Sequence, residues 1–317
     1  MDIQVLLWLQ NLRGGALDSI LMAITDFVAS PVMYVFVAVL YWCYNKRAAT
    51  FLAMNLSFGS LVNQGLKNTF CVYRPWIRNP QVVPLEAARK TATGYSFPSG
   101  HTQIASSEFL SLAYWQKQRK WVVSACVFMT LLVMFTRMYL GVHTPQDVLA
   151  SLAVSLVVIF LNARLLSWIE SGKNRDIWVF VIGCVIAAAF LTYTTVKAYP
   201  MDYGVDGRLL VNSKEMITDC YAAAGCVFGF LIGFIAEHRL VKFNTAVSGK
   251  VRLLRGVFGA IILYIFSEFC REPLAAMHMY WGELFFFLFA FLYILFLYPA
   301  LFSLWERYFM KKKKRTA

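Results

Sequence analysis

Charged residues are scarce in this sequence, and the scarcity excludes most soluble folds. Asp, Glu, Lys and Arg make up 15% of the 317 residues, hydrophobic residues make up 59%, and the mean hydropathy is +0.58. Long uncharged runs recur along the whole chain, which is typical of a protein that crosses a membrane several times. We therefore predict an all-α fold, a polytopic bundle of transmembrane helices.

Metal-binding motifs and a disulfide framework are also absent from the sequence. The seven cysteines are scattered, mostly within apolar runs, and no CxxC pair occurs. Such cysteines are typical of small packing residues rather than of metal ligands. We expect neither a metal nor a cofactor.

Acidic residues are fewer than basic ones, 17 against 30, which gives a net charge of +13. In a soluble protein this excess would favour a nucleic-acid partner, but membrane proteins concentrate Lys and Arg in their cytoplasmic loops. We therefore expect no nucleic-acid partner. The run Lys311–Arg315 is instead expected to contact anionic membrane lipids, at about 1 kcal/mol per basic residue.

No change in composition marks a domain boundary, so residues 1–317 are predicted to form one integral membrane domain. Within it we distinguish a core at about 20–170, additional helices at about 175–305 and a basic tail at 306–317. A spanning helix needs about 20 apolar residues. Nine runs qualify approximately, at 21–44, 49–66, 100–116, 121–137, 146–166, 177–197, 217–236, 254–270 and 280–305. An odd number of spans places the two termini on opposite sides.

The basic residues indicate which side is cytoplasmic. They cluster in every second connection and after the last span, at residues 46–47, 117–120, 164–175, 239–255 and 311–315. All these clusters share the cytoplasmic side if the N-terminus is outside and the C-terminus is cytoplasmic. The loop at 67–98 is the exception, because it carries five cations on the predicted outer face. Anion binding is the obvious reason for positive charge in that loop.

Three short stretches at predicted helix ends share that outer face. They are Lys67-x6-Arg74-Pro75, Pro98-Ser99-Gly100-His101 and Thr136-Arg137-x5-His143-x3-Asp147. Lys67, Arg74 and Arg137 supply cations that suit phosphate oxygens. Ser99 and Gly100 stand where a helix begins, and the free N–H groups and positive dipole end of a helix favour an anion. The three stretches together predict a phosphate site.

The two histidines of these stretches suggest two chemical roles. Asp147 follows His143 by about one helical turn, with Thr144 as a plausible N-cap and Pro145 in the first turn. A carboxylate beside an imidazole fixes its tautomer and stabilises the cation that forms on attack, so His143 is the candidate nucleophile. His101 is then left as the general acid for the leaving group.

The order of these motifs resembles the tripartite signature of the type-2 phosphatidic acid phosphatase superfamily. That group includes lipid phosphate phosphatases, undecaprenyl diphosphate phosphatases, sphingosine-phosphate phosphatases, glucose-6-phosphatases and vanadium haloperoxidases. The signature covers residues 67–147, under half of the chain, and the one departure is Thr136, where serine is usual. Threonine keeps the hydroxyl group.

The resemblance implies a metal-independent phosphatase that works through a phosphohistidine on His143, with His101 as acid and Asp147 as the partner of His143. The phosphate would be bound by Lys67, Arg74, Ser99, Gly100 and Arg137. The expected substrate is a lipid phosphate or lipid diphosphate that reaches the site from the membrane. We favour the bacterial cytoplasmic membrane over the endoplasmic reticulum, with the active site on the extracytoplasmic face.

Other functions stay open at this point. A sugar-phosphate phosphatase similar to glucose-6-phosphatase, or a lipid phosphotransferase, would use the same residues. A non-enzymatic anion carrier needs cations but has no need of the His143–Asp147 pair. The haloperoxidase reading fits poorly, since the vanadate enzymes of this group are soluble. Four acids within the apolar runs, Asp26, Glu108, Glu268 and Glu283, are candidates for a substrate path.

The predicted topology can be tested by cysteine-accessibility labelling from one side of the membrane. Arg89→Cys lies in the loop predicted to be outside, and Lys250→Cys lies in a connection predicted to be cytoplasmic. An impermeant thiol reagent should label the first position and spare the second in sealed cells. Labelling of both positions from the same side would contradict the topology.

Overall fold

The computed structural model describes residues 2–205 and 207–316, with side chains up to residue 308. All named elements in these ranges are helices. The first half contains α1 (Asp2–Gln10), α2 (Gly15–Ala29), α3 (Pro31–Cys43), α4 (Lys46–Phe70), α5 (Pro75–Arg78), α6 (Glu86–Thr91), α7 (Gly100–Ala105), η1 (Ser106–Leu110), α8 (Ser111–Trp115), α9 (Lys120–Tyr139) and α10 (Pro145–Glu170). The second half contains α11 (Arg175–Val196), α12 (Ser213–Ala236), η2 (Glu237–Val241), α13 (Gly249–Phe269), α14 (Arg271–Met277), α15 (Met279–Leu292), η3 (Tyr293–Leu297) and α16 (Tyr298–Thr316). The predicted all-α class is confirmed for these residues, whereas the side chains of Lys311–Arg315 lie outside the described ones.

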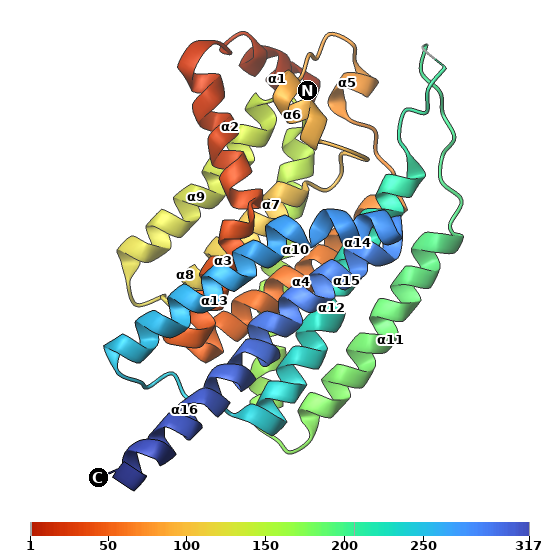
Figure 1. Ribbon diagram of the computed structural model, residues 1–317. Helices are drawn as coiled ribbons and strands as arrows, with labels where there is room; N and C mark the ends of the chain where they lie inside the picture. Colours follow the sequence, from red (N-terminus) through yellow and green to blue (C-terminus); the bar gives the residue numbers. More distant parts are fainter. Residues whose placement is uncertain (1, 206, 317) are drawn as a thin grey trace.

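Two long helices join the halves of the chain. Helix α4 packs against α3, α7 and α10 on one side and against α12 on the other, while α12 also contacts α11 and α15. Figure 1 shows the resulting bundle, with the chain termini at opposite ends and the short helices α5 and α6 at the same end as α1. The helices of the second half therefore pack directly on the core that carries the sequence motifs.

The number of spans is only partly settled by helix length and apolarity. Within the described residues, five helices are long and apolar enough to cross a membrane, or up to seven if two bent pairs each count as one span. One pair is α2 with α3, bent by 47° at Pro31, where a helix interior cannot accommodate the proline ring. The protein is thus a multi-pass membrane protein, and the count of nine and the orientation remain predictions.

The predicted spans at 49–66 and 100–116 fall on helices that do not pass this test: α4 is long enough but too polar, and the run from α7 to α8 is too short. Their polar side chains face protein instead of lipid: Asn55, Asn63, Ser107 and Glu108 are all at most 2% exposed. Asn162 of α10 donates to Asn55 Oδ1 at 2.9 Å, and Ser107 donates to the Asn55 carbonyl at 3.2 Å. A polar residue at membrane depth is tolerated where other helices satisfy it.

A glycine stripe on α12 sets the distance to α15. An added Cβ would lie 2.3 Å from the Leu284 carbonyl oxygen at Gly225 and 2.5 Å from the Leu288 carbonyl oxygen at Gly229. Real side chains do not approach that closely, so the two backbones can meet only because these positions lack a Cβ. Gly233 lies one turn further on, and a Cβ added there would lie 2.9 Å from the Cβ of Leu295.

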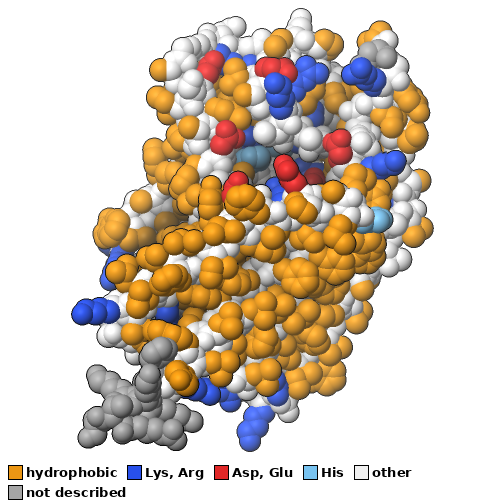
Figure 2. Space-filling model, viewed as in Figure 1, with side chains coloured by type: hydrophobic (Ala, Val, Ile, Leu, Met, Phe, Trp, Pro, Cys, Tyr) orange, Lys and Arg blue, Asp and Glu red, His pale blue; other side chains and the backbone are white. Residues whose placement is uncertain are grey.

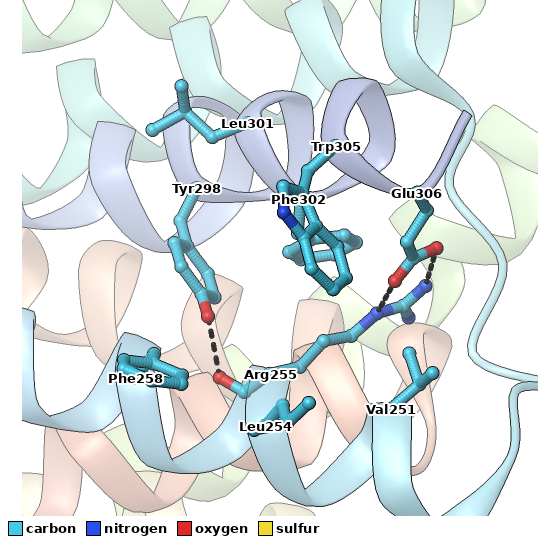
Figure 3. Close-up of a pocket in the computed structure, with 9 residues that line it drawn as sticks. All are labelled: Val251, Leu254, Arg255, Phe258, Tyr298, Leu301, Phe302, Trp305 and Glu306. Carbon is cyan, nitrogen blue, oxygen red and sulfur yellow. Dashed lines mark hydrogen bonds and ion pairs between the residues drawn. The ribbon is translucent and has the colours of Figure 1, made fainter. Parts of the chain in front are cut away.

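Helices α13 and α16 are joined by an ion pair at the end of the bundle that lies farthest from α5 and α6. Arg255, only 4% exposed, donates to both carboxylate oxygens of Glu306 at 2.7 and 2.6 Å, and its guanidinium lies 4.2 Å from the Phe302 ring centre. Figure 3 shows this pair beside an apolar groove. The sequence analysis placed Arg255 in a cytoplasmic connection, whereas the structure makes it a buried residue of α13.

The glycine stripe predicts a stability difference between two glycine-to-alanine substitutions. Gly225→Ala should lower the free energy of unfolding by about 1–3 kcal/mol, because α12 and α15 must move apart. Gly65→Ala in α4 is the matched control, since its added Cβ would lie 3.7 Å from Phe190, an ordinary contact. Thermal unfolding in detergent should show a lower midpoint for Gly225→Ala alone, and equal midpoints would contradict the close-packing argument.

Candidate active site

The predicted site residues meet around one cavity of about 370 Å³. Six of the eight line it directly: Lys67, Arg74, Gly100, His101, Arg137 and His143. The other two, Ser99 and Asp147, are buried behind them, at 0% and 2% exposure. Figure 2 shows histidine at the bottom of a hollow near one end of the molecule, with acidic side chains around its rim and a broad hydrophobic surface below.

Asp147 is held in place by the start of α10. The Thr144 side chain caps this helix by accepting from the Asp147 N–H, and the Asp147 carboxylate accepts from the Thr144 N–H at 2.7 Å. Pro145 occupies the first turn. The predicted N-cap is thereby confirmed. The same oxygen, Asp147 Oδ2, lies 3.6 Å from Nδ1 of His143, and both side chains are 2% exposed. The helix cap thus places a carboxylate beside the imidazole.

Arg74 fixes the tautomer of His143. Its NH1 group lies 3.0 Å from His143 Nε2 and also donates to the Val142 carbonyl at 3.0 Å. A guanidinium can only donate hydrogen bonds, so Nε2 must be the acceptor and the imidazole proton must be on Nδ1, toward Asp147. Nε2 therefore carries a lone pair, as a nucleophilic histidine requires, and this lone pair is directed at Arg74, which lines the cavity together with His143.

The surroundings of His143 also keep its ring neutral. Burial and the nearby Arg74 cation hold the pKa of His143 well below its usual value, although Asp147 acts in the opposite direction. Burial likewise lowers the pKa of Arg74 to about 10, which leaves the guanidinium charged at neutral pH. A neutral imidazole next to a permanent cation is ready to attack an anionic phosphate group.

The three cations approach the cavity from three different helices or loops. Arg74 is anchored by the carbonyls of Gly94 and Thr93 at 3.1 and 2.7 Å, and Lys67, at the end of α4, donates to the Tyr95 carbonyl at 3.1 Å. Arg137, at the end of α9, donates from NH1 to Thr25 at 3.0 Å. Its Nε is buried without a hydrogen-bond partner among the described residues, so this cation has an unused donor.

The second motif contributes the start of α7. Ser99 caps the helix by accepting from the Thr102 N–H at 3.4 Å, and its own N–H donates to the Asp147 carbonyl at 3.2 Å. Gly100 has open space where a Cβ would stand, so its backbone is directly accessible from the cavity. His101 follows in the first turn, lines the cavity and is partly exposed. The N–H groups of a first helical turn have no partners within the helix.

Sequence reasoning missed several polar residues of the site. Ser96 donates from its hydroxyl to Asp147 Oδ2 at 2.6 Å and lies 3.5 Å from His143 Nδ1. Gln64 and Asp219 line the cavity, as do Arg271 and Glu283. Ser96 stands two residues before Pro98, and this closeness to the second motif is the only feature of the sequence that could have pointed to it. Of the four acids proposed for a substrate path, Glu283 lines the cavity, and Glu108 is buried with its Oε2 unpartnered among the described residues.

Comparison with known proteins links both halves of the chain to one family. The family model described as "PAP2 superfamily" matches residues 48–171. A second model, described as "PAP2 superfamily phosphatase, transmembrane extension", matches residues 221–307. The first match contains all eight predicted site residues, and the second contains the helices that pack on the core through α12. No solved structure gave a significant match.

Curated relatives with significant similarity include three membrane-lipid enzymes by name. The lipid phosphate phosphatase delta of Arabidopsis thaliana is 25% identical over 60% of this chain, and the match spans 49% of the plant protein. Undecaprenyl-diphosphatase BcrC of Bacillus subtilis is 26% identical over 48% of this chain and 76% of its own length. Phosphatidylglycerophosphatase B of the same organism is 33% identical over 35% of this chain and 55% of its own length.

The role of Ser96 can be tested by removing its hydroxyl. Ser96→Ala should lower kcat/KM by roughly 10- to 100-fold, because Asp147 loses a charge-assisted hydrogen bond and holds His143 less firmly. Ser96→Thr keeps a hydroxyl and should recover part of the loss. Ser106→Ala is the matched control, since Ser106 is also fully buried but its Oγ has no hydrogen-bond partner among the described residues. Equal activity of the two alanine variants would contradict this role.

Proposed function

The chain belongs to the PAP2 superfamily, and from this premise we propose that it hydrolyses a lipid phosphate or lipid diphosphate through a phosphohistidine on His143. One observation carries the proposal. The unprotonated Nε2 of a neutral His143 contacts Arg74 at the wall of a cavity that His143 lines together with Lys67, Arg74 and Arg137. Three cations around a nucleophile are suited to a phosphate group, whose negative charge they neutralise.

Binding of the phosphate would replace the contact between Arg74 and His143. Arg74 NH1 donates to His143 Nε2 in the structure. An anionic phosphate oxygen is a stronger acceptor for the guanidinium than a neutral imidazole nitrogen, so the phosphate would take over this hydrogen bond. Lys67, the free Nε of Arg137 and the N–H groups at the start of α7 surround the same space. Because protein cations neutralise the phosphate from several sides, the proposed reaction needs no divalent metal.

The first chemical step forms the covalent intermediate. Burial and the Arg137 cation hold the pKa of His101 well below its usual value, so His101 takes up its proton together with the phosphate anion, which offsets the cations. His143 Nε2 attacks phosphorus, the bond from phosphorus to the ester oxygen breaks, and the His101 imidazolium gives its proton to the departing alkoxide. The imidazole then carries positive charge, which the Asp147 carboxylate stabilises from the Nδ1 side. Asp147 in turn is oriented by Ser96 and the Thr144 N–H.

The second step returns the enzyme to its starting state. Neutral His101 accepts a proton from water while the water oxygen attacks phosphorus and the bond to Nε2 breaks. Inorganic phosphate leaves, and His143 regains its lone pair. An acceptor alcohol in place of water would give a phosphotransferase, so transfer and hydrolysis differ only in the second nucleophile.

A lipid substrate agrees with the surface of the protein and with the names of its relatives. The cavity lies at one end of a bundle whose apolar helices face outward, so a phosphate head group could reach the site while its chain stays in the membrane. The relatives are named for lipid phosphates, undecaprenyl diphosphate and phosphatidylglycerophosphate. We propose that this end of the bundle faces the extracytoplasmic side, as the basic residues of the connections predict.

The two histidine roles predict different failures. His143→Ala should abolish the covalent intermediate with every substrate. His101→Ala should slow its formation by about 10²–10⁴-fold when the leaving group is an alkoxide, and much less for a nitrophenyl phosphate, which needs little protonation. The measurement is acid-labile radiolabel on the protein after rapid quench with a ³²P-labelled substrate, in buffer that contains EDTA.

His238→Ala is the control for these variants, because His238 lies in η2 at the other end of α12, away from the cavity. It should trap as much label as the unaltered protein. Label trapped in His143→Ala would reverse the assignment, and an equal loss on both substrates in His101→Ala would remove its role as acid. Activity lost in EDTA and restored by magnesium would contradict the metal-independent mechanism.

A further inference from the structure

The cavity has a second wall, which comes from helices α12, α14 and α15. Beyond the phosphate-binding core, it is lined by Thr218, Asp219 and Cys226 of α12, by Arg271 at the start of α14, and by Glu283 and Phe287 of α15. No motif pointed to these residues. The proposed reaction uses none of them, so they are free to contact the part of the substrate that lies next to the phosphate.

The charge of this second wall is opposite to that of the core wall, which carries the cations Lys67, Arg74 and Arg137. Arg271 pairs with Glu283, with Nε 3.2 Å from Oε1 and NH2 3.5 Å from Oε2. These two charges offset each other, which leaves the carboxylate of Asp219. The cavity is therefore cationic on the core side and acidic on the extension side.

Two hydrogen-bond acceptors on the second side lack donors. Asp219 makes no hydrogen bond or direct ion pair with another described residue, although its charge interacts with that of Lys67. Gln64 of α4, which also lines the cavity, has its Oε1 buried without a partner among the described residues. Gln64 Oε1 is buried, and a buried acceptor left unpaired is costly, whereas the Asp219 carboxylate is partly exposed and lines the cavity. Both acceptors are suited to donors that a ligand brings.

We propose that Asp219 is a specificity-determining residue that selects lipid monophosphates with a hydroxyl or ammonium group beside the phosphate. The inference rests on the proposed function, because it assumes that the core wall holds the phosphate. Asp219 lines the same cavity as Lys67, so a donor on the carbon next to the phosphate ester is the substrate group expected to reach it. Gln64 Oε1 offers the same donor a second acceptor.

The same wall disfavours a diphosphate. A second phosphate group beside the first would bring more negative charge toward Asp219. The cations that line the cavity are Lys67, Arg74 and Arg137, which surround the first phosphate, and Arg271, which Glu283 already binds. The second phosphate would therefore meet a carboxylate without a free cation to offset it.

The experiment compares four synthetic substrates of one chain length: an alkyl phosphate, its 2-hydroxy and 2-amino derivatives, and the alkyl diphosphate. The unaltered protein should show a higher kcat/KM for the 2-hydroxy or 2-amino compound than for the plain phosphate. Asp219→Asn should reduce that ratio by about 10- to 100-fold, the effect of losing a hydrogen bond to a charged group. The same variant should raise kcat/KM for the diphosphate relative to the plain phosphate.

Glu215→Gln is the matched control, because Glu215 is an exposed acid one turn earlier on α12 and does not line the cavity. Its substrate ratios should equal those of the unaltered protein. A preference for the amino compound alone would identify an ammonium ligand, and a preference shared by both derivatives would identify a general donor. Either result supports the proposal.

Three results would overturn the proposal. The first is an equal kcat/KM for all monophosphates in the unaltered protein, and the second is a preference for the diphosphate that Asp219→Asn leaves intact. The third is an equal loss on every substrate in Asp219→Asn, which would make Asp219 a positioning residue for Lys67. None of these three results bears on the proposed function, which this experiment would contradict if the unaltered protein turned over none of the four compounds.

Discussion

The fold and the proposed chemistry depend on a single carboxylate oxygen, Oδ2 of Asp147. It accepts hydrogen bonds from the Thr144 N–H and the Ser96 hydroxyl, and it lies 3.6 Å from His143 Nδ1. The first bond closes the capping box that begins α10, the second fixes the loop before α7, and the third contact orients the imidazole. Because one atom serves all three, the helix start, the loop position and the direction of the Nε2 lone pair cannot vary independently.

The cations of the core suit the proposed site to an anion. Lys67, Arg74 and Arg137 are each at most 5% exposed, and burying three positive charges together is costly unless negative charge or acceptors compensate. Backbone carbonyls accept hydrogen bonds from the side-chain donors of Lys67 and Arg74. Arg137 instead keeps a buried Nε without a partner among the described residues. The protein's own acceptors therefore do not compensate these charges fully, and a phosphate group would supply the missing acceptors. The cations are held in place by the protein itself, so the proposed reaction needs little reorganisation.

Local sequence pattern was sufficient where the structure depends on neighbouring residues. The spacing of His143 and Asp147, the Thr144 cap and Pro145 all follow from the geometry of one helical turn. The pattern could not reveal Ser96, because its bond to Asp147 joins positions 51 residues apart through the fold of a loop. It could not reveal Asp219 either, since only the packing of α12 on α4 brings that residue to the cavity. Apolarity alone does not settle the number of spans, for the same reason. Whether a polar helix such as α4 faces lipid or protein is decided by tertiary contacts, which composition does not record.

The glycine stripe of α12 connects this packing to the substrate cavity. Gly225 and Gly229 let α15 approach α12 to backbone contact, and the two helices place Asp219 and Glu283 in the wall opposite the cations. The groups proposed to bind phosphate all belong to the core, whereas the groups proposed to face the remainder of the substrate belong largely to α12, α14 and α15. Bond cleavage needs the fixed geometry around His143, which the capping box and the anchored arginine provide. Recognition of a head group needs only charge and hydrogen-bond acceptors in the opposite wall. The two requirements are met by different helices, so the residues of α12, α14 and α15 can change the substrate without disturbing the nucleophile.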